Sequence, residues 1–287
     1  MPPPDFATAA FAVPNRCRRF EGQVAIVTGA AQGLGRAIAH RLGQEGASLV
    51  IADIQGERAE RTAGQLAAEL RVPAIAFAGD LSEAGVAEQM VESTLQRFGR
   101  IDALVNNAAA LIRLKLVDMS EELLHKGVQW NVWNTLRCCK AVLPAMLARR
   151  YGRIVNIGGE AWRTGFPYHT ILAGVGKGSM VGLTATLAGE VLRDGITVNC
   201  VSPGGIETAA DGDPEPLPPS SFRDPSWNPP DVMQAMAEAA RARAQAGGIG
   251  RLSHPSEVAA AVAFFASFEA SFTTGQHIGV SGGMAML

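Results

Sequence analysis

Short apolar runs alternate with longer helical patterns along most of this chain. The runs lie at 24–27, 48–52, 74–78, 101–105, 153–157 and 195–201, with a last one inside 276–283. They are short and rich in β-branched residues, as buried strands are. Between them, apolar residues recur at helical spacing over 55–70, 86–98, 123–147, 232–246 and 257–267. This alternation predicts a single α/β domain, a doubly wound parallel sheet of about seven strands with helices on both faces.

A glycine-rich turn joins the first apolar run to a predicted helix that lies between the runs at 24–27 and 48–52. It contains Thr28, Gly29, Gly33 and Gly35. The missing side chains let backbone N–H groups and the positive end of the helix approach a pyrophosphate. The second apolar run ends at Asp53, where a carboxylate can accept hydrogen bonds from the ribose hydroxyls of an adenosine and repel a 2′-phosphate. Together these features predict a Rossmann-type site for NAD rather than NADP.

The composition is that of an ordinary globular protein. The 287 residues are 47% hydrophobic and carry a net charge of −2, which suits one large domain and indicates no basic face for nucleic acid. Glycine or charged residues interrupt the longest apolar stretches, so no membrane span is predicted. The four cysteines have neither metal-ligand spacing nor the density of a disulfide framework. We therefore expect no metal site, a core position for Cys138 and Cys139, and a cytoplasmic protein.

Two segments differ from the rest of the chain. Residues 1–20 contain four of the 16 prolines and lack the continuous apolar core of a signal peptide, so we expect a flexible arm before a domain spanning 21–287. Residues 203–230 contain eight prolines and precede an alanine-rich helical stretch. A proline-rich flap before a helix is typical of a substrate lid, which we place at about 205–250.

Several motifs resemble those of the short-chain dehydrogenase/reductase family. The segment 28–35, TGAAQGLG, is similar to the family's cofactor motif TGxxxGxG, and NNAA at 106–109 is similar to NNAG. Asn131 precedes Pro144 of AVLPAM by the family's interval. SPGGIET at 202–208 and QHIGVSGG at 276–283 resemble two further landmarks. The resemblance runs from Phe20 to Gly283, nearly the whole chain.

The resemblance implies a nicotinamide cofactor, NAD, bound along these motifs. The residues it assigns to the cofactor are Gly29, Gln32, Gly33, Leu34, Gly35, Asp53, Asp80, Leu81, Asn107, Ala108, Lys177, Pro203, Gly204 and Thr208. Within this set, Asp80 and Leu81 would hold the adenine ring and Thr208 would hydrogen-bond the carboxamide. A helix N-cap is the alternative role for Asp80, because Ser82 and Glu83 follow it.

The family's catalytic set is only half present. In the family, a tyrosine exchanges the alcohol proton, a lysine one helical turn away lowers the pKa of that tyrosine, a serine orients the substrate oxygen and an asparagine holds a relay water. Asn131 and Lys177 match the asparagine and the lysine. Ala173 stands four residues before Lys177, at the tyrosine position, and Gly159 or one of its two neighbours stands at the serine position.

Three other groups are candidates for the proton transfer. Tyr168 and His169 lie in the loop before the Lys177 helix, where family members place substrate-contacting residues, and Glu160 follows the fifth strand. A phenol, an imidazole and a buried carboxylate can each exchange protons. A pocket wall for Tyr168 and a solvated loop position for His169 are the structural alternatives. Tyr151, the other tyrosine, precedes the fifth strand at the end of the sheet away from the cofactor.

These features predict an NAD-dependent oxidoreductase with a non-standard proton donor. The expected substrate is a cyclic or aromatic secondary alcohol, or a dihydrodiol, because the segments CCKAVLPAML and SPGGIET are similar to those of bacterial cis-dihydrodiol dehydrogenases. The expected apolar pocket wall comprises Ala110, Trp162, Phe166, Tyr168 and the lid, whereas Trp130 and Trp133 are assigned to the core or an interface.

A catalytically silent NAD-binding subunit, paired with an active paralogue, is the alternative function. A protein with an unrelated binding role is the third possible function. Family members usually form dimers or tetramers through the two long helices that contain Asn131 and Lys177, so the resemblance implies a homodimer or homotetramer. Partners other than a small-molecule substrate, such as nucleic acid or a membrane, are not expected.

Overall fold

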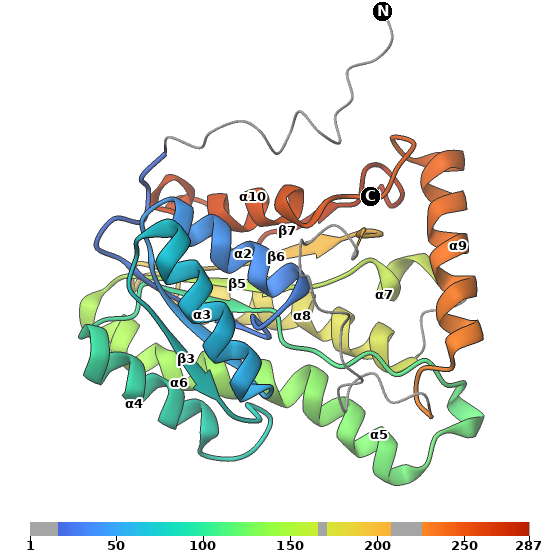
Figure 1. Cartoon of the computed structure of the whole chain (residues 1–287), viewed down its shortest axis with the longest axis horizontal. Coiled ribbons are helices and arrows are strands. Elements are labelled where there is room, and N and C mark those ends of the chain that lie inside the picture. Colours follow the sequence, from blue (N-terminus) through green and yellow to red (C-terminus); the bar gives the residue numbers. More distant parts are fainter. Residues whose placement is uncertain (1–16, 166–170, 208–225, 287) are drawn as a thin grey trace, which may run out of the picture.

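The fold is built on one seven-stranded parallel sheet in the order β3-β2-β1-β4-β5-β6-β7 (Figure 1). The computed structural model describes residues 17–165, 171–207 and 226–286. The strands are β1 (Val24–Thr28), β2 (Ser48–Asp53), β3 (Ala74–Ala78), β4 (Ala103–Asn106), β5 (Gly152–Ile157), β6 (Ile196–Pro203) and β7 (His277–Val280). All six pairings are parallel. The predicted doubly wound α/β domain is confirmed.

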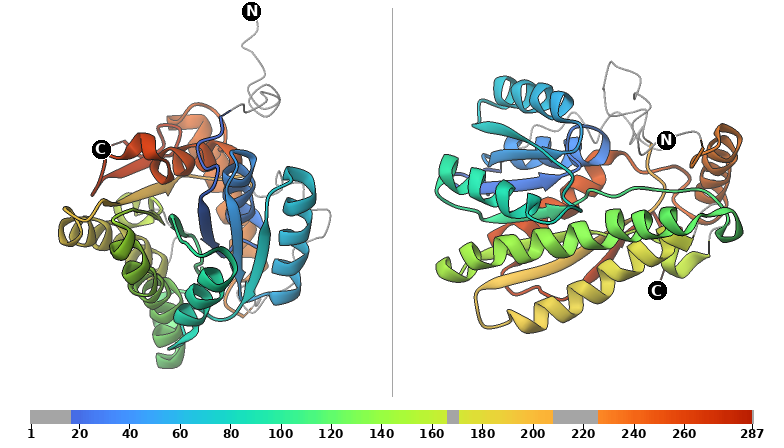
Figure 2. Two further views of the ribbon diagram at one scale, coloured as in Figure 1. Left: turned by 90° about the vertical axis from the view of Figure 1, so that its left-hand side faces the viewer. Right: turned by 90° about the horizontal axis from the view of Figure 1, so that it is seen from below.

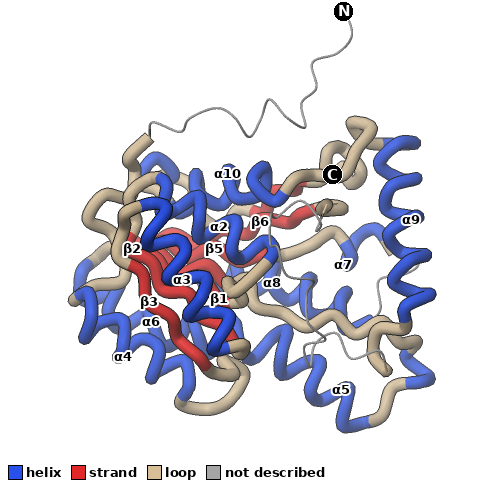
Figure 3. Tube along the Cα trace, viewed as in Figure 1, coloured by secondary structure: helices blue, strands red, loops and turns tan. Residues whose placement is uncertain are grey.

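Helices cover both faces of the sheet (Figures 2 and 3). The helices on one face are α2 (Gly33–Gln44), α3 (Gly56–Leu70) and α10 (Pro255–Ala266). Those on the other face are α4 (Val86–Phe98), α6 (Asn134–Arg149) and α8 (Ile171–Glu190). Side chains of β1 alternate between these layers: Ala25 and Val27 join the first core, and Val24 and Ile26 the second. This alternation is the period of a strand that is buried on both faces.

The strand order places a crevice at the carboxyl ends of β1 and β4. The chain runs from β1 outward to β3 and then returns to β4 on the other side of β1. At such a switch point the connections leave in opposite directions, so the loops diverge and a ligand can enter between them. The glycine-rich turn after β1 and the asparagines at the end of β4 therefore meet at one place.

The helical stretch predicted over 123–147 is two helices rather than one. Helix α5 (Glu121–Val128) and α6 flank a π-helical turn at Gln129–Trp133. The Asn131 amide donates to the carbonyl of Gly127, four residues earlier, and to that of Ala110. A side chain inserted into the helical ladder in this way is a recognised cause of a local break.

The structured domain begins before the predicted boundary at residue 21. Phe20 is fully buried in the core of α2, α3 and α10. The Arg19 guanidinium binds the carboxylates of Glu45 and Glu269. The sequence Arg19-Phe20 thus belongs to the domain, and residues 1–16 lie outside the described residues.

Helix α8 is a longer apolar stretch than the sequence pattern predicted. It is the one helix of the described part of the chain that is long and apolar enough, by length and composition, to cross a membrane. In the fold it packs on β5 and β6. This packing accounts for part of its apolar character, since 33% of the apolar stretch is buried inside the chain. Cys138 and Cys139 are buried, as predicted.

The remaining described helices lie near the carboxyl ends of the strands. They are α7 (Ala161–Thr164) and α9 (Pro230–Gly247), with a 3-10 turn at Leu116–Asp118. A second 3-10 turn, Phe268–Ala270, follows α10 at the amino ends of the strands, where Glu269 pairs with Arg19. Helix α9 stands beyond the sheet, on the right in Figure 1. It includes the alanine-rich stretch that was predicted to form part of a lid.

Candidate active site

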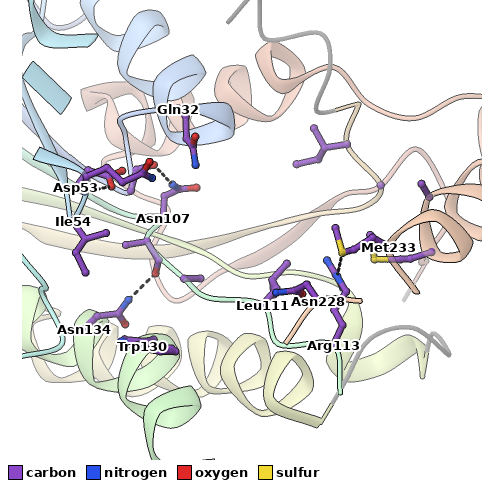
Figure 4. A pocket seen from close by; sticks show the side chains of 18 of the residues that line it. Gln32, Asp53, Ile54, Asn107, Leu111, Arg113, Trp130, Asn134, Asn228 and Met233 are labelled. Atoms are coloured by element: carbon purple, nitrogen blue, oxygen red, sulfur yellow. Dashed lines mark hydrogen bonds between the residues drawn. The ribbon is translucent and has the colours of Figure 1, made fainter. Parts of the chain in front are cut away.

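A cavity of about 590 Å³ lies at the carboxyl ends of β1, β2 and β4 (Figure 4). Its lining includes eight of the residues assigned to the cofactor: Gly29, Gln32, Asp53, Asp80, Leu81, Asn107, Ala108 and Gly204. Among the described residues, the assigned Gly33, Leu34, Gly35, Lys177 and Pro203 do not line it. Thr208 lies outside the described residues.

The glycine-rich turn is packed so closely that side chains would not fit. A Cβ on Gly29 would lie 2.9 Å from Cα of Ala108, and the backbone there is left-handed, with φ of +62°. A Cβ on Gly35 would lie 2.1 Å from the carbonyl oxygen of Gly29. The Asn107 amide fixes the turn by donating to the carbonyls of Thr28 and Gly29, each at 3.0 Å.

Helix α2 begins at this turn without a side-chain cap. Its N-cap residue is Gln32, and no side chain of the described residues caps the helix there. The first N–H groups of a helix have no partner inside the helix, so they are available to an anion. The turn and the helix end therefore fit the pyrophosphate of a dinucleotide.

The Asp53 carboxylate is held in place at the end of β2. One oxygen accepts from the backbone N–H of Ala31 at 3.1 Å and the other from that of Gln55 at 3.0 Å. Burial raises the pKa of the Asp53 carboxyl above its usual value, and these backbone donors partly offset that effect. Each carboxylate oxygen can accept a second hydrogen bond, so Asp53 retains acceptor capacity toward the cavity.

Asp80 and Leu81 lie together on the cavity wall. Leu81 is buried, and one Asp80 oxygen accepts from the Ser82 N–H at 2.9 Å and from its hydroxyl at 2.6 Å. The alternative role of Asp80 as a helix N-cap is wrong, because Gly85 is the N-cap of α4.

The structure packs the helix that carries Lys177 against Asn131. A Cβ on Gly176 would lie 2.7 Å from Cβ of Asn131, so α8 packs directly against the π-helical turn. The Asn131 amide donates to the Ala110 and Gly127 carbonyls, both at 2.8 Å. The Lys177 ammonium donates to the carbonyl of Ile157 at 3.0 Å. Burial lowers the pKa of Lys177 from 10.5 to about 8.

Gly159 is the position after β5 that faces Lys177. A Cβ there would lie 3.2 Å from Cγ of Lys177. Gly158 is excluded as the serine position, because its Cβ would lie 2.3 Å from Oγ of Ser202. That hydroxyl accepts from the Gly159 N–H at 2.9 Å and is 2.7 Å from Nε2 of His277. Burial lowers the pKa of His277.

One candidate for the proton transfer is engaged elsewhere. The Glu160 carboxylate forms an ion pair with Arg163. It lies against β7, where a Cβ on Gly279 would be 2.8 Å from its Oε1. The ion pair and the contact with β7 argue against its use as the base. Tyr168 and His169 lie outside the described residues.

The far end of the cavity has a different wall from the predicted one. Ala110 is buried and Trp162 packs edge-on to His277 at 5.8 Å, and neither lines the cavity in the described part of the chain. Phe166 is outside the described residues. The observed wall includes Leu111, Arg113, Trp130, Asn228, Met233 and Met236.

Trp130 packs against a small core cluster, in line with the prediction, and it also lines this end of the cavity. Its ring lies 5.4 Å from that of Trp227, which belongs to the proline-rich segment 203–230. In the sequence, the position of Trp130 next to Asn131 was the feature that could have indicated a place in the site. No cluster of three or more potential metal ligands occurs among the residues that the structure describes.

Comparisons with known proteins match nearly the whole chain. A family model described as enoyl-(acyl carrier protein) reductase matches residues 29–285. The 2,3-dihydroxy-2,3-dihydro-p-cumate dehydrogenase of Pseudomonas putida is 36% identical over 267 residues, 93% of this chain and 96% of the relative. The 1,6-dihydroxycyclohexa-2,4-diene-1-carboxylate dehydrogenase of Acinetobacter baylyi is 38% identical over 274 residues, 94% of this chain and 98% of the relative.

A solved structure has the same fold. The crystal structure of a 3-oxoacyl-(acyl-carrier protein) reductase with bound NAD from Brucella melitensis aligns with a TM-score of 0.79 and 28% identity, covering 94% of each chain. The family model, the relatives and the geometry of the turn and cavity together show that this chain belongs to the short-chain dehydrogenase/reductase family of nicotinamide-dependent oxidoreductases.

Proposed function

We propose that this protein is an NAD-dependent dehydrogenase of cyclic or aromatic secondary alcohols, with a dihydrodiol as the favoured substrate. The single observation that carries the proposal is the continuous cavity, which runs from Asp53 to the apolar wall around Trp130 and Met233. Both curated relatives are named as dehydrogenases of dihydroxylated compounds. A ring fits against this apolar wall.

Asp53 supports NAD over NADP. The Asp53 carboxylate is shielded from bulk solvent, accepts hydrogen bonds from two backbone N–H groups and faces the cavity at the end of β2. A fixed negative charge favours ribose hydroxyls as donors and disfavours a 2′-phosphate.

The remaining cofactor contacts follow from the placement of the motifs. The glycine-rich turn and the start of α2 would hold the pyrophosphate, Asp80 and Leu81 the adenine, and Gly204 and Thr208 the nicotinamide end. When bound, NAD supplies the hydride acceptor. Lys177 would hold the nicotinamide ribose, and its partly buried ammonium adds positive charge beside the reacting alcohol.

The alcohol proton needs an acceptor on the protein. Ala173, one helical turn before Lys177, is buried and has no group that can take a proton. We assign this role to Tyr168 or His169, which precede α8 in the sequence. A dihydrodiol reduces the demand on that group, because its oxidation leads to an aromatic ring and is therefore favourable. Asn131 would hold a water that connects the site to solvent.

The test is NADH formation by the purified protein across a panel of cyclic alcohols and dihydrodiols. The proposal predicts turnover of a dihydrodiol, reduced about 10²- to 10⁴-fold in either Tyr168→Phe or His169→Ala. Binding of NAD without turnover of any dihydrodiol would contradict it.

A catalytically silent subunit is the second candidate, favoured by Gly159 and Ala173. The structure places Gly159 against Lys177, where a serine hydroxyl would orient a substrate. A silent wild type and an active Gly159→Ser, Ala173→Tyr double variant would support this candidate and direct the search to an active paralogue. A Cβ at position 159 would lie 3.2 Å from Cγ of Lys177, so a serine fits there after a small shift of the flexible lysine side chain.

We also propose a cytoplasmic homodimer or homotetramer whose contact includes α8. Only 33% of the apolar window of this helix is buried inside the chain. Its exposed face carries Ile171, Val175 and small residues, which allow a second helix to approach. The segment at about 205–250 would serve as a substrate lid, and among its described residues Gly205, Ile206, Glu207, Asn228 and one side of α9 line the cavity.

A further inference from the structure

The described chain ends in a compact turn after β7. The backbone N–H of Met284 donates to the Ser281 carbonyl at 3.1 Å, and the Ser281 hydroxyl donates to the Ala285 carbonyl at 3.2 Å. These bonds close a turn of residues 281–285, which we call the C-terminal strap. The residue after the strap, Met286, is 83% exposed, so the packing contacts of this region are made by the strap itself.

The Met284 side chain packs between the turn after β6 and the end of α9. A Cβ on Gly204 would lie 2.8 Å from Cε of Met284, and a Cβ on Gly248 would lie 3.1 Å from its Cγ. Gly204 lines the cavity, and Gly248 is the C-cap residue of α9. The N–H of Ile249 donates to the Gly282 carbonyl at 2.8 Å. The strap therefore joins the wall of the cavity to the C-terminal end of α9.

Two arginines tie the strap to the helices on either side of it. The Arg243 guanidinium on α9 donates to the Met284 carbonyl at 3.2 Å. The Arg163 guanidinium on α7 donates to the next carbonyl, that of Ala285, also at 3.2 Å. The strap thus connects three parts of the chain that are distant in sequence: the segment after β5, the turn after β6 and α9.

The helix that the strap holds forms one wall of the substrate end. One side of α9 lines the cavity with Met233, Met236, Ala237, Ala240 and Arg241. Figure 4 shows Met233 beside Arg113 of the loop after β4. Nearer the strap, a Cβ on Gly205 would lie 3.7 Å from Cβ of Ala240. The distance of α9 from the turn after β6 therefore sets the width of this end of the cavity.

We propose that Met284 is a positioning residue for the substrate, and that the strap holds α9 at the distance from Gly204 and Gly205 at which a ring fits. The inference rests on the proposed function, because it takes a ring diol as the occupant of this end. Without the Met284 side chain, a space opens between Gly204 and Gly248 and α9 moves more freely. The adenosine half of the cofactor is unaffected, because Asp53 lies at the opposite end of the cavity (Figure 4).

The first test measures hydrogen–deuterium exchange of the full-length protein. Met284→Ala should speed exchange of the α9 amides about 10-fold, because the helix opens more easily once the packing contact is gone. Exchange in α2 should stay as in the wild type. Met284→Leu keeps most of the side-chain volume and should restore slow exchange. Met286→Ala is the matched control, a methionine that is 83% exposed, and it should change nothing.

The second test measures catechol binding by calorimetric titration into the complex with NADH. Catechol is a ring with two adjacent hydroxyls, the product expected from a dihydrodiol. Met284→Ala should weaken catechol binding about 10-fold and NADH binding by less than about twofold, because only the substrate end loses its preorganised wall. Met284→Leu and Met286→Ala should bind catechol as the wild type does. A general loss of stability would instead lower the melting temperature and weaken both ligands.

Equal exchange of α9 in the wild type and Met284→Ala would overturn the inference, as would the same acceleration in α2 or in Met286→Ala. A wild type that does not bind catechol, or that binds it no better than Met284→Ala, would also overturn it. Met284→Val provides a milder variant if Met284→Ala does not fold. Turnover of a dihydrodiol with the same KM in wild type and Met284→Ala would overturn this inference alone. Catechol binding that depends on Met284, without turnover of any dihydrodiol, would contradict the proposed function alone.

Discussion

Asp53 and Lys177 are the two charged residues that most constrain the chemistry of this site. Asp53 is fixed by backbone donors from two different loops, so its charge cannot easily turn away from a ligand. Lys177 is fixed through the carbonyl of Ile157 at the end of β5. Both are charged groups whose burial disfavours the ionised form. Such groups are retained at functional sites more often than in ordinary cores.

Replacing Asp53 should change the choice of cofactor. We expect Asp53→Asn to weaken NADH binding about 10- to 100-fold, because charge-assisted hydrogen bonds to the ribose are lost, while NADPH binding weakens less or improves. Dissociation constants for both nucleotides, measured by calorimetry, provide the check. Asp118→Asn, on the exposed 3-10 turn, is the control and should change neither constant. An unchanged ratio in Asp53→Asn would rule out this residue as the selector.

Lys177 should titrate far below an ordinary lysine. Burial lowers its pKa from 10.5 to about 8, so NMR of protein labelled with ¹³C-lysine should show one midpoint near pH 8. The chain has only four lysines, and Lys177→Met identifies the signal. Between pH 8 and 10.5 the folded protein binds fewer protons than the unfolded chain at this site. Wild-type stability relative to Lys177→Met should therefore rise with pH over that window. A midpoint near 10.5 would contradict this account.

At the scale of elements, the contact between α8 and the π-helical turn positions the catalytic candidates. Gly176 allows the two backbones to approach, because its missing side chain leaves room for Asn131. The same approach places Lys177 beside Gly159. The site therefore depends on a helix contact that a single methyl group would disturb.

Gly176→Ala should destabilise the protein by about 1–3 kcal/mol through overpacking against Asn131. Urea unfolding measures the change. Gly64→Ala, within α3, is the matched control, since no atom lies within 4 Å of a Cβ at that glycine. It should stabilise the protein by about 0.5–1 kcal/mol, because alanine is the better helix former. Equal effects of the two substitutions would show that the contact does not matter.

The sequence predicted the elements well and their long-range contacts poorly. The strand at 24–27, the glycine-rich turn and Asp53 carry local patterns, and the structure joins them as expected. The π-helical turn escaped prediction because the Asn131 amide reaches Ala110, a residue from another element. Arg113 was missed for the same reason, since its position depends on the Trp227 carbonyl. The predicted pocket residues Ala110 and Trp162 were wrong, because aligned position does not determine which side chains face a cavity.

At the scale of the whole molecule, the exposed face of α8 is the proposed contact between subunits. We expect the wild type to sediment as a dimer or tetramer. Ala185→Glu, on the exposed face of α8, should reduce the assembly by placing a desolvated, unpaired charge in the contact. Ala68→Glu, on an exposed position of α3, should leave it intact. A wild-type monomer would exclude this contact, and an assembly unaffected by Ala185→Glu would place it elsewhere.

The most direct test of the central claim is transfer of deuterium from substrate to cofactor. A cyclic dihydrodiol deuterated at its carbinol carbons is incubated with the wild-type protein and NAD, and the recovered nucleotide is analysed by mass spectrometry. We predict one deuterium in each reduced nucleotide, as hydride transfer at this site requires, while the second carbinol deuterium is lost to water when the oxidised product becomes aromatic. Tightly bound NAD that remains oxidised and unlabelled, with every diol tested, would contradict the assignment as a dehydrogenase.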